Sequence, residues 1–432
     1  MEMASHEAVS KQMETTSETV DNRHLSLLKK KVEKTKHAPP SRRIQYDDPS
    51  AVAKLKKTQI VRKKTAERAV PLFSHLPQYE QESIFSRGFQ RDASELHPAV
   101  IKLGLQYASD VISGASSRCL SLLDTLALVI ESFSLSEILE TRDYRRELDK
   151  YIRRNIQFLT DCRPLSISMG NCIRYIKSRI SHLSPSIPEI ENKSSLLKTI
   201  RSFREEKFER TEEMIAELGA KRIRDGDTIL TLGRSSCVEE IFVKAKECGK
   251  DFHVIVLEAR PRQEGLELCK NLIRVGVKTD YSSLFAASYY MRDVNLVLCG
   301  AEGLMSTGAV ISGLGTACVA LVAKEYHVPV MIASQTIKFS ERGHLDAICF
   351  NEIGNPEELV DHDGSEWFMK NSNKNKFDNI LKENWKEMKN LKVLNLYYDL
   401  TPVEFIDAVI TEVGIIPPSS VPVVLREYMS LA

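Results

Sequence analysis

The sequence predicts an α/β protein in which an all-helical domain precedes a doubly wound, mostly parallel sheet, behind a disordered basic tail. Helix-spaced apolar residues fill the region 71–218. From Gly219 onward, apolar runs alternate with helical patterns at about 25-residue spacing, as they do in parallel sheets. The stretch Val297–Thr316 reads as a strand, a glycine-dotted loop and the start of a helix. That layout places ligands at the carboxyl edge of an open α/β sheet.

Residues 1–70 are polar and basic and show no sustained hydrophobic period. Up to Ala69 there are 16 Lys and Arg against 9 Asp and Glu, with the densest clusters at Lys29–Lys31 and Arg62–Lys64. This composition is typical of a disordered, solvated tail. The alternative is an arm that contacts RNA, because basic tails bind phosphate backbones without a fold. No aromatic residue stands within the basic clusters to stack bases, since the single tyrosine of this region, Tyr46, lies outside them; this favours the solvated tail.

The region 71–218 is predicted to form a helical domain. One helix begins at Pro98, where a first helical turn tolerates proline. Another covers Arg118–Phe133, whose apolar residues recur at helical spacing. Further helices are predicted at Tyr144–Leu159, Ser166–His182 and Lys193–Leu218. Gly219 is expected to cap the last of them.

The region 219–432 is predicted to be a Rossmann-like domain. Strands are predicted at Thr228–Leu232, His253–Leu257, Val277–Asp280, Asn295–Cys299, Val328–Ala333 and Leu391–Leu396. Helices are predicted at Ser236–Cys248, Leu266–Val275, Ser283–Met291, Gly315–Tyr326 and Val403–Val413. The polar segment Trp367–Lys389 is expected to be an insertion or a surface helix, and the chain after Gly414 an extended, proline-rich tail.

Composition narrows the function classes. The net charge of +1 gives no global field for nucleic acid or an anionic membrane. No run approaches the roughly 20 apolar residues of a membrane span, and the amino terminus lacks the apolar core of a secretory signal. The 9 cysteines include no CxxC pair and lie mostly in apolar segments. This pattern indicates reduced thiols in the cytosol rather than a disulfide framework or a metal site.

No cofactor motif is intact, so no cofactor is predicted. Gly313, Gly315 and Cys318 form a damaged dinucleotide fingerprint, and it follows its strand by about 13 residues rather than directly. A phosphate-binding GxxxxGK[ST] loop does not occur. His327 is predicted to be a loop or core residue, while His344 and Cys349 are too isolated for a metal site.

Charged residues at element ends are the better candidates for a binding site. Arg163, Glu258, Arg260 and Glu302 each fall where a predicted element ends, and several meet at the carboxyl edge of the sheet. The arginines could hold an anionic ligand. Equally, Arg163 and Arg260 could pair with Glu258 or Glu302 and lock the two domains together.

Four strings carry a family resemblance: RPLSISMGNCIRYI (163–176), LEARPRQEG (257–265), GAEGLMSTGAVISGLGT (300–316) and YDLTPVEFIDAVITEVG (398–414). They resemble a superfamily that joins the regulatory subunits of eukaryotic translation initiation factor 2B to methylthioribose-1-phosphate and ribose-bisphosphate isomerases. Three further strings, at 72–80, 97–123 and 410–426, are most similar to the delta-type regulatory subunits. The resemblance covers roughly residues 70 to 432.

The resemblance implies that the isomerase chemistry has been lost. The cysteine of the isomerases falls on Gly233, beside Arg234, and their catalytic aspartate falls on Glu302. Their substrate-holding Asn-Lys pair falls on Ser312 and Gly313. Their glutamine after the Arg-Pro motif falls on Glu264, whose carboxylate would repel a sugar phosphate. The phosphate-contacting arginine survives as Arg163. Acid–base exchange needs both proton-moving groups, so no catalytic residue is predicted.

Cys237, four residues beyond Gly233, is a weak substitute because it is expected to point into helix packing.

The resemblance also implies a function. It implies a regulatory subunit of the guanine-nucleotide exchange factor for initiation factor 2, which pairs with a beta subunit and assembles with alpha, gamma and epsilon subunits. The phosphorylated alpha subunit of initiation factor 2 would be sensed by the complex, with exchange activity in the epsilon subunit. Alternatives are a sugar-phosphate isomerase with a rearranged site and a sugar- or nucleotide-phosphate sensor.

Candidate contact residues follow from this interpretation. The subunit interface is predicted at Leu304, Val310, Ile311, Leu314 and the run Ile415–Leu425, with Ile101 and Leu103 at the centre of the assembly. The groove for initiation factor 2 is predicted at Arg145, Arg146, Arg153 and Arg154, whose guanidinium groups suit acidic or phosphate oxygens. A solvated helix face is the alternative for these arginines.

Overall fold

The computed structural model describes residues 69–79, 96–134, 143–184, 187–343, 346–360, 385–388 and 390–429. All of them belong to one compact unit, Thr65–Ala432. The predicted 1–70 tail, apart from Ala69 and Val70, lies outside the described residues, as do His344 and nearly all of Trp367–Lys389.

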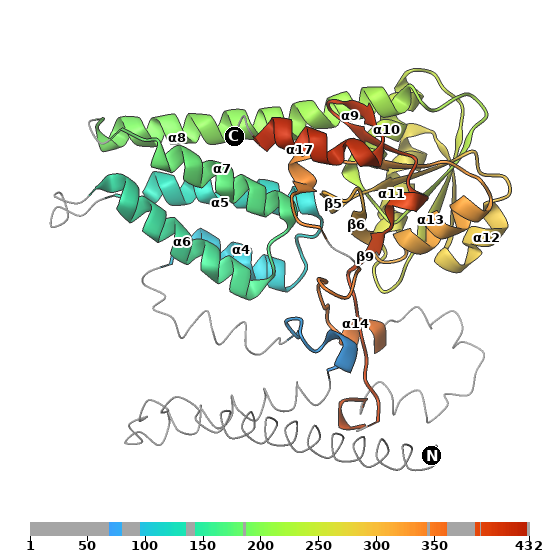
Figure 1. Cartoon of the computed structure of the whole chain (residues 1–432), viewed down its shortest axis with the longest axis horizontal. Helices are drawn as coiled ribbons and strands as arrows, with labels where there is room; N and C mark the ends of the chain where they lie inside the picture. Colours follow the sequence, from blue (N-terminus) through green and yellow to red (C-terminus); the bar gives the residue numbers. More distant parts are fainter. Residues whose placement is uncertain are drawn as a thin grey trace, which may run out of the picture. The chain divides into compact units, whose positions relative to one another are not determined.

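The first half of the described unit is helical, as predicted (Figure 1). Its helices are α4 (Pro98–Ala108), α5 (Ala115–Ser132), α6 (Tyr144–Cys162), α7 (Ile167–Ser181), α8 (Glu189–Arg204) and α9 (Arg210–Ala220). Asp143 and Ser166 cap α6 and α7, because each side chain accepts a hydrogen bond from a first-turn backbone N–H. Leu122, Leu126 and Ile152 belong to a single apolar core shared by α4 to α8.

The helices α8 and α9 are joined through one π-helical stretch, Glu205–Glu209, into a continuous rod. The predicted cap at Gly219 is wrong, because the helix runs through it to Ala220. A Cβ atom at Gly219 would lie 2.5 Å from the Cδ1 of Ile241. Glycine at this position therefore allows α9 to pack closely against α10 (Ser236–Glu247), and it does not end the helix.

We expect Gly219→Ala to lower the free energy of unfolding by about 1–3 kcal/mol, because the fully buried Ile241 has no room to yield. Ile241→Ala should cost about 2–5 kcal/mol by itself. Urea unfolding of both single variants and the double variant measures their coupling. The double variant should lose less than the sum of the single losses, whereas strict additivity would show that the two positions do not compete for one space.

A seven-stranded sheet forms the second half, in the order β11-β10-β7-β4-β1-β2-β3. Its strands are β1 (Thr228–Leu232), β2 (His253–Glu258), β3 (Lys278–Ser283), β4 (Leu296–Gly300), β7 (Val330–Ala333), β10 (Ala408–Thr411) and β11 (Gly414–Ile416). Every neighbouring pair is parallel except β10 and β11. The predicted Rossmann-like sheet is therefore confirmed.

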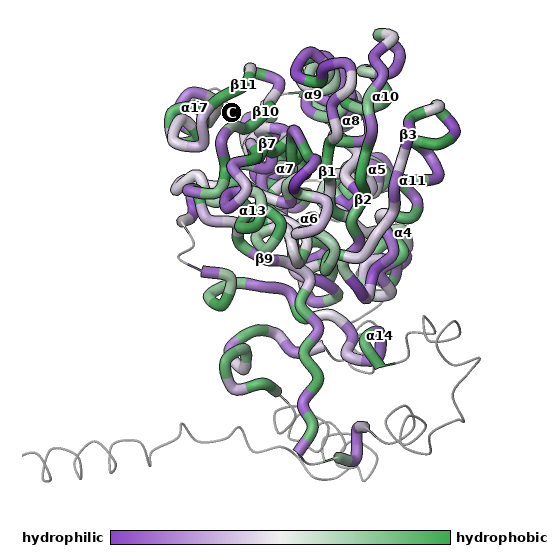
Figure 2. Tube along the Cα trace, turned by 90° about the vertical axis from the view of Figure 1, so that its right-hand side faces the viewer, coloured by the Kyte–Doolittle hydropathy of each residue, from purple (hydrophilic) through white to green (hydrophobic). Residues whose placement is uncertain are grey.

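Helices cover both faces of this sheet. Val254 and Val256 face a core completed by α9, α10 and α11 (Glu264–Val275). Leu230 and Val297 face the opposite core, completed by α12 (Ala287–Tyr290), α13 (Thr316–Glu325) and α17 (Val421–Met429). Because successive residues of a strand point to opposite faces, strands that are apolar throughout are suited to burial on both sides. Figure 2 shows this hydrophobic character along β1, β2 and β7.

A second, four-stranded sheet takes its two central strands from the segment predicted as a glycine loop. Its order is β8 (Phe339–Ser340), β5 (Gly303–Met305), β6 (Val310–Gly313) and β9 (Tyr398–Thr401). β5 and β6 form a hairpin that turns at Gly308, whose φ of 85° favours glycine. The prediction missed these strands because each is too short to show a hydrophobic period.

The prediction for the carboxyl-terminal region is wrong in three places. The predicted helix Val403–Val413 is a 3-10 turn at Val403–Phe405 followed by β10, because the β-branched run around Val409 pairs with β7. The predicted closing strand Leu391–Leu396 has only an isolated bridge between Leu396 and Ile353. The tail expected to be extended contains β11 and α17 instead.

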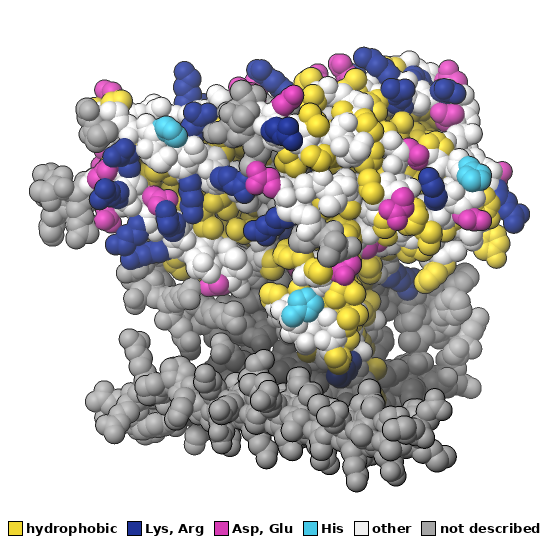
Figure 3. Space-filling model, viewed as in Figure 1, with side chains coloured by type: hydrophobic (Ala, Val, Ile, Leu, Met, Phe, Trp, Pro, Cys, Tyr) yellow, Lys and Arg dark blue, Asp and Glu magenta, His cyan; other side chains and the backbone are white. Residues whose placement is uncertain are grey.

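No helix among the described residues is both long and apolar enough to cross a membrane. In the face shown in Figure 3, Lys and Arg side chains gather over the helical half, and hydrophobic side chains are more frequent over the half that holds the sheet.

Candidate functional site

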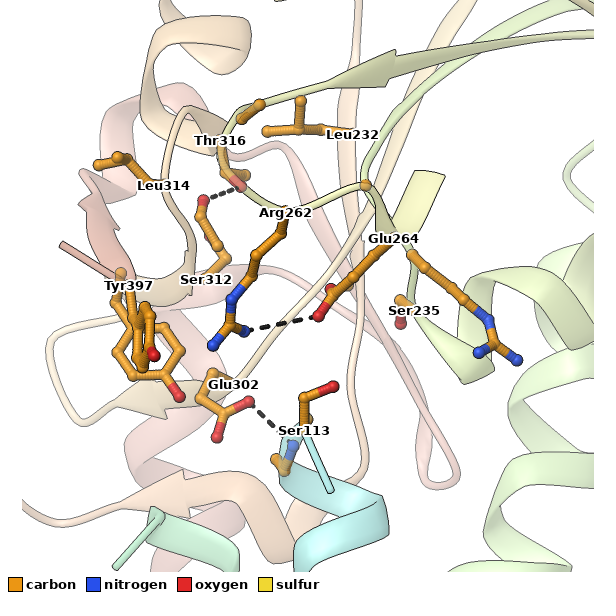
Figure 4. Close-up of a pocket in the computed structure, with 18 of the residues that line it drawn as sticks. Ser113, Leu232, Ser235, Arg262, Glu264, Glu302, Ser312, Leu314, Thr316 and Tyr397 are labelled. Atoms are coloured by element: carbon orange, nitrogen blue, oxygen red, sulfur yellow. Dashed lines mark hydrogen bonds and ion pairs between the residues drawn. The ribbon is translucent and has the colours of Figure 1, made fainter. Parts of the chain in front are cut away.

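A cavity of about 330 Å³ opens at the carboxyl ends of β1, β2 and β4. The first turn of α5 forms another wall, so the cavity lies between the helical half and the sheet (Figure 4). Carboxyl ends of parallel strands meet at one edge of a sheet, which explains why residues far apart in sequence converge here.

Most of the predicted pocket residues line this cavity. They are Gly233, Arg234, Glu258, Arg260, Glu264, Glu302, Ser312 and Gly313. Arg163 is not among the lining residues. The lining residues that the prediction missed include Arg262, Lys338 and Tyr397. Arg262 stands inside a string that carried the family resemblance, but nothing local to Lys338 or Tyr397 indicated that they would reach this edge.

Arg163 is held in a buried ion-pair cluster. Its side chain is 5% exposed, its Nε donates to Glu352, and its Nη1 lies 2.5 Å from the Oδ1 of Asp110. Arg118, which is also buried, lies near Glu352 and donates to the carbonyl oxygen of Pro164. The expected phosphate-binding arginine is thus engaged by carboxylates. The alternative partners considered for it, Glu258 and Glu302, are not the ones it contacts.

Asp110 also joins the cluster to the cavity wall. Its second carboxylate oxygen accepts from Arg262, and the guanidinium of Arg262 stacks over the Tyr397 ring at 3.9 Å from the centroid. Arg163 contacts the same ring at 5.1 Å. Figure 4 shows Arg262 reaching into the cavity between Tyr397 and Glu264. The cluster therefore ties the ends of α4 and α6 to the loop after β2.

Glu302, which stands at the position of the isomerase aspartate, makes a structural contact with α5. Its Oε2 accepts from the backbone N–H of Ala115 at 3.0 Å, at the amino terminus of α5. A carboxylate is stabilised there because free N–H groups and the helix dipole make that end positive. The position of the isomerase thiol, Gly233, has a φ of 61°, which favours glycine.

Cys237 does not replace the missing thiol. It is fully buried in α10, does not line the cavity, and burial raises the pKa of its thiol. A thiol must ionise to act as a nucleophile, so this environment makes it inert. The cavity thus lacks the thiol of the isomerases, and Glu302, at the position of their aspartate, holds the first turn of α5 through its Oε2.

Lys338 supplies a buried positive charge to the cavity. Its side chain is 5% exposed and its Nζ donates to the carbonyl oxygen of Ala301 at 3.0 Å. Together with Arg262 and the first turn of α5, it gives the cavity wall an anion-binding character. The carboxyl groups of Glu264 and Glu258, which line the same cavity, oppose that character. Within the described ranges, no group of three His, Cys, Asp or Glu side chains could hold a metal ion.

Glu258 gives the site a pH dependence. Burial raises the pKa of its carboxyl to about 7 from the usual 4.5, although the backbone N–H groups of Gly265 and Leu266 act to lower it. The folded chain therefore keeps a proton that the unfolded chain releases above 4.5. Its contribution to stability is full below that pH and is lost as the pH rises toward 7.

Glu258→Gln should abolish this loss, because the amide carbonyl can still accept from Gly265. Between about pH 4.5 and pH 7, the wild-type chain should lose roughly 1–3 kcal/mol of unfolding free energy relative to the variant, at about 1.4 kcal/mol for each tenfold change in proton affinity. Urea unfolding across this pH range measures the difference, with Glu264→Gln at a half-buried position as the control. Parallel pH profiles for wild type and Glu258→Gln would contradict the assignment.

The predicted subunit-contact residues are mostly covered within the chain itself. Leu304 and Val310 belong to the main sheet core, and Ile311 to a small cluster beneath the second sheet. Leu103 is buried in the helical core and Ile101 packs against it. Among the four predicted contact residues between Leu304 and Leu314, only Leu314 is exposed. The run Ile415–Leu425 is divided between β11 and α17, with Val423 exposed.

A different set of apolar side chains is exposed. Phe285 and Tyr289, next to and within α12, are 90% and 79% exposed. Leu321 on α13 and Val403 on the 3-10 turn Val403–Phe405 add to them, and α13 contacts both α12 and this turn. We call Phe285, Tyr289, Leu314, Leu321 and Val403 the apolar face. Large exposed apolar side chains on elements that contact one another are candidates for a protein–protein contact.

The predicted groove arginines lie along α6. Arg145 is partly occupied, because it pairs with Asp143 at 2.8 Å and donates to the carbonyl oxygen of Leu183. Arg146 and Arg153 are 88% and 67% exposed and pair with acidic neighbours in or next to the same helix. Arg154 and Lys150 complete an exposed basic face at helical spacing.

Residues 111–418 match the family described as the initiation factor 2 subunit family. The chain belongs to this family. It is 42% identical to the Dictyostelium discoideum translation initiation factor eIF2B subunit delta over 390 residues, 89% of this chain. It is 35% identical to the Schizosaccharomyces pombe eIF2B subunit delta, covering 84% of this chain and 74% of that protein.

A related isomerase and a solved complex complete the comparison. The ribose 1,5-bisphosphate isomerase of Pyrococcus furiosus is 36% identical over 289 residues, 66% of this chain and 82% of the enzyme. A chain of the tetrameric eIF2B-beta2-delta2 complex from C. thermophilum superposes with a TM-score of 0.67 at 30% identity, covering 80% of this chain and 99% of that one. The chain spans 60% of the length of the Dictyostelium relative.

Proposed function

We propose that this chain is a non-catalytic regulatory subunit of the guanine-nucleotide exchange factor that acts on translation initiation factor 2. The observation that carries the proposal is the cavity: its walls persist, yet glycine occupies the thiol position and Glu302 caps α5. Loss of an acid–base group typically costs about 10²- to 10⁴-fold in rate; here glycine replaces the thiol, and the carboxylate at the aspartate position is engaged by the backbone of α5. Similarity to delta subunits supports the regulatory role.

The partners follow from the same proposal. The chain pairs with a beta subunit, as the delta chains of the C. thermophilum beta2-delta2 complex do, and assembles with alpha, gamma and epsilon subunits in the cytosol. Exchange activity resides in the epsilon subunit. The apolar face meets the beta subunit, since its large exposed side chains would otherwise remain in water.

The basic face of α6 contributes to the binding of initiation factor 2. Arg146, Lys150, Arg153 and Arg154 offer charge-assisted hydrogen bonds to acidic or phosphorylated side chains of its alpha subunit. Regulation then requires that the phosphorylated partner bind two arrangements of the complex with different affinity.

Co-expression with a beta subunit tests the proposal. We expect the two chains to purify as one complex whose mass, measured by light scattering, exceeds the sum of one copy of each. The purified complex should show no turnover of ribose 1,5-bisphosphate. A chain that stays monomeric in the presence of the beta subunit, or that isomerises the sugar phosphate, would contradict the proposal.

A phosphate-sensing function is the second candidate, because Lys338 and Arg262 give the cavity buried or half-buried positive charge. Thermal unfolding in the presence of a panel of sugar phosphates and nucleotides separates the two. The regulatory-subunit proposal expects no concentration-dependent shift, whereas a saturable shift that Lys338→Met removes would favour a sensor.

A further inference from the structure

Two cysteine thiols face each other between α5 and α7. The Sγ atoms of Cys119 and Cys172 lie 2.9 Å apart, and both side chains are fully buried in the helical core. All nine cysteines of the chain are free thiols in the structure. The two sulfur atoms are therefore close together without being bonded to each other.

The packing of the two helices fixes this juxtaposition independently of the thiols. One turn earlier on each helix, the hydroxyl of Ser168 donates to the carbonyl oxygen of Ala115 at 3.4 Å. Both contacts join residues 53 positions apart. A constant offset over one helical turn means that α5 and α7 run parallel in fixed register, so the two cysteines face each other wherever the helices pack this way.

From this geometry we propose that Cys119 and Cys172 form an intramolecular disulfide when the chain meets a hydroperoxide. The bond would cross-link α5 to α7 in the helical half of the chain. This site does not depend on the proposed regulatory function.

The chemistry balances with hydrogen peroxide as the two-electron oxidant. One thiolate attacks a peroxide oxygen, so that an S–O bond forms, the O–O bond breaks and hydroxide leaves as water after taking up a proton. The second thiolate attacks the sulfenic sulfur, so that the S–S bond forms, the S–O bond breaks and a second water is released. The two thiols lose two protons and two electrons in total.

The cavity provides the short route to the pair. Ala115, one turn before Cys119, lines the cavity, whereas the thiols themselves are covered. Burial and the neighbouring thiol raise the pKa of Cys172 well above its usual value, which makes its thiolate scarce. The reaction is therefore expected to be slow and to proceed through local opening of the first turns of α5 and α7.

The cross-link would act on the junction between the two halves. Asn171, next to Cys172, donates from its side-chain amide to the carbonyl oxygens of Ile337 and Phe339 at 2.8 and 2.9 Å. These residues flank Lys338 at the cavity wall. A disulfide that holds α7 to α5 would thus stiffen the backbone that positions Lys338.

The test uses the full chain under native conditions with hydrogen peroxide, followed by unfolding, alkylation with N-ethylmaleimide and mass spectrometry. The reduced chain should carry a label on each of its 9 cysteines, and the oxidised chain should leave two unlabelled. Peptide mapping should find a linked pair containing Cys119 and Cys172, lighter than the two reduced peptides by about 2 Da. Dithiothreitol should restore full labelling.

Cys172→Ala is the matched variant, because alanine fits a buried apolar site. It should lose the linked peptide and leave Cys119 available for labelling after oxidation. The proposal is wrong if the exposed thiols Cys248, Cys318 and Cys349 oxidise while Cys119 and Cys172 remain fully labelled in wild type. It is also wrong if the link forms only after the chain has been unfolded, since native packing would then not direct it.

Discussion

Arg163→Ala is expected to lower the free energy of unfolding by about 3–5 kcal/mol, because it removes one partner of a buried ion pair. The guanidinium of Arg163 is 5% exposed, and it bonds Glu352, whose side chain is 9% exposed. Without Arg163, the cationic partner left to the carboxylate of Glu352 among the described residues is the more distant Arg118, at 3.9 Å. A buried charge that loses its partner bears its full desolvation cost.

Arg153→Ala is the matched control for this experiment. Arg153 lies 2.6 Å from Asp149, close to the 2.5 Å that separates Arg163 from Asp110, but its side chain is 67% exposed. Exposed pairs contribute about 0–1 kcal/mol, so this variant should unfold almost as wild type does. Urea unfolding at neutral pH measures both. Equal losses for the two variants would show that burial of the Arg163 cluster does not matter for stability.

Tyr289→Glu is expected to weaken pairing with the beta subunit by about 30-fold or more, which corresponds to about 2 kcal/mol for a central interface residue. Tyr289 belongs to the apolar face, and a carboxylate there would be buried without a partner once the subunits meet. Phe285→Glu should act in the same direction, since Phe285 is 90% exposed. Both substitutions should leave the stability of the isolated chain within about 0.5 kcal/mol, because the side chains are in water there.

Ile190→Glu is the control for the pairing experiment. Ile190 is 80% exposed, nearly the same as Tyr289, but it lies on α8 in the helical half. Analytical ultracentrifugation of each variant mixed with the beta subunit measures the dissociation constants. Wild-type affinity for Tyr289→Glu, or equal weakening by Ile190→Glu, would place the contact elsewhere on the chain.

The part of the candidate site that depends on strand positions could be predicted from the local hydrophobic pattern. Gly233, Glu258 and Glu302 each follow or end a strand that the hydrophobic pattern identified, and parallel strands bring their carboxyl ends together. Once these strands are assigned, the convergence of the three residues follows without any knowledge of side-chain packing. The β5–β6 hairpin was not predictable in this way, because strands of three and four residues carry too little pattern.

The partners of the site residues were not predictable. Arg163 and Glu352 are 189 positions apart, and the acceptor of Arg262 lies 152 positions away on the other half of the chain. Two residues of the predicted interface, Leu304 and Val310, are apolar as an interface requires, but they pack into the core of their own chain. Hydrophobicity alone does not distinguish a residue that packs on its own chain from one that packs on another.

The sequence by itself determined the order of most helices and strands, the edge at which the cavity forms and the family to which the chain belongs. Those properties depend on periodicity and on short strings, which are local. Only the tertiary structure decided that Arg163 is bound by carboxylates, that Glu302 caps α5 and that Cys119 faces Cys172. Each of these contacts joins distant segments, and its free energy depends on which helix packs against which strand rather than on the residues next to it in sequence.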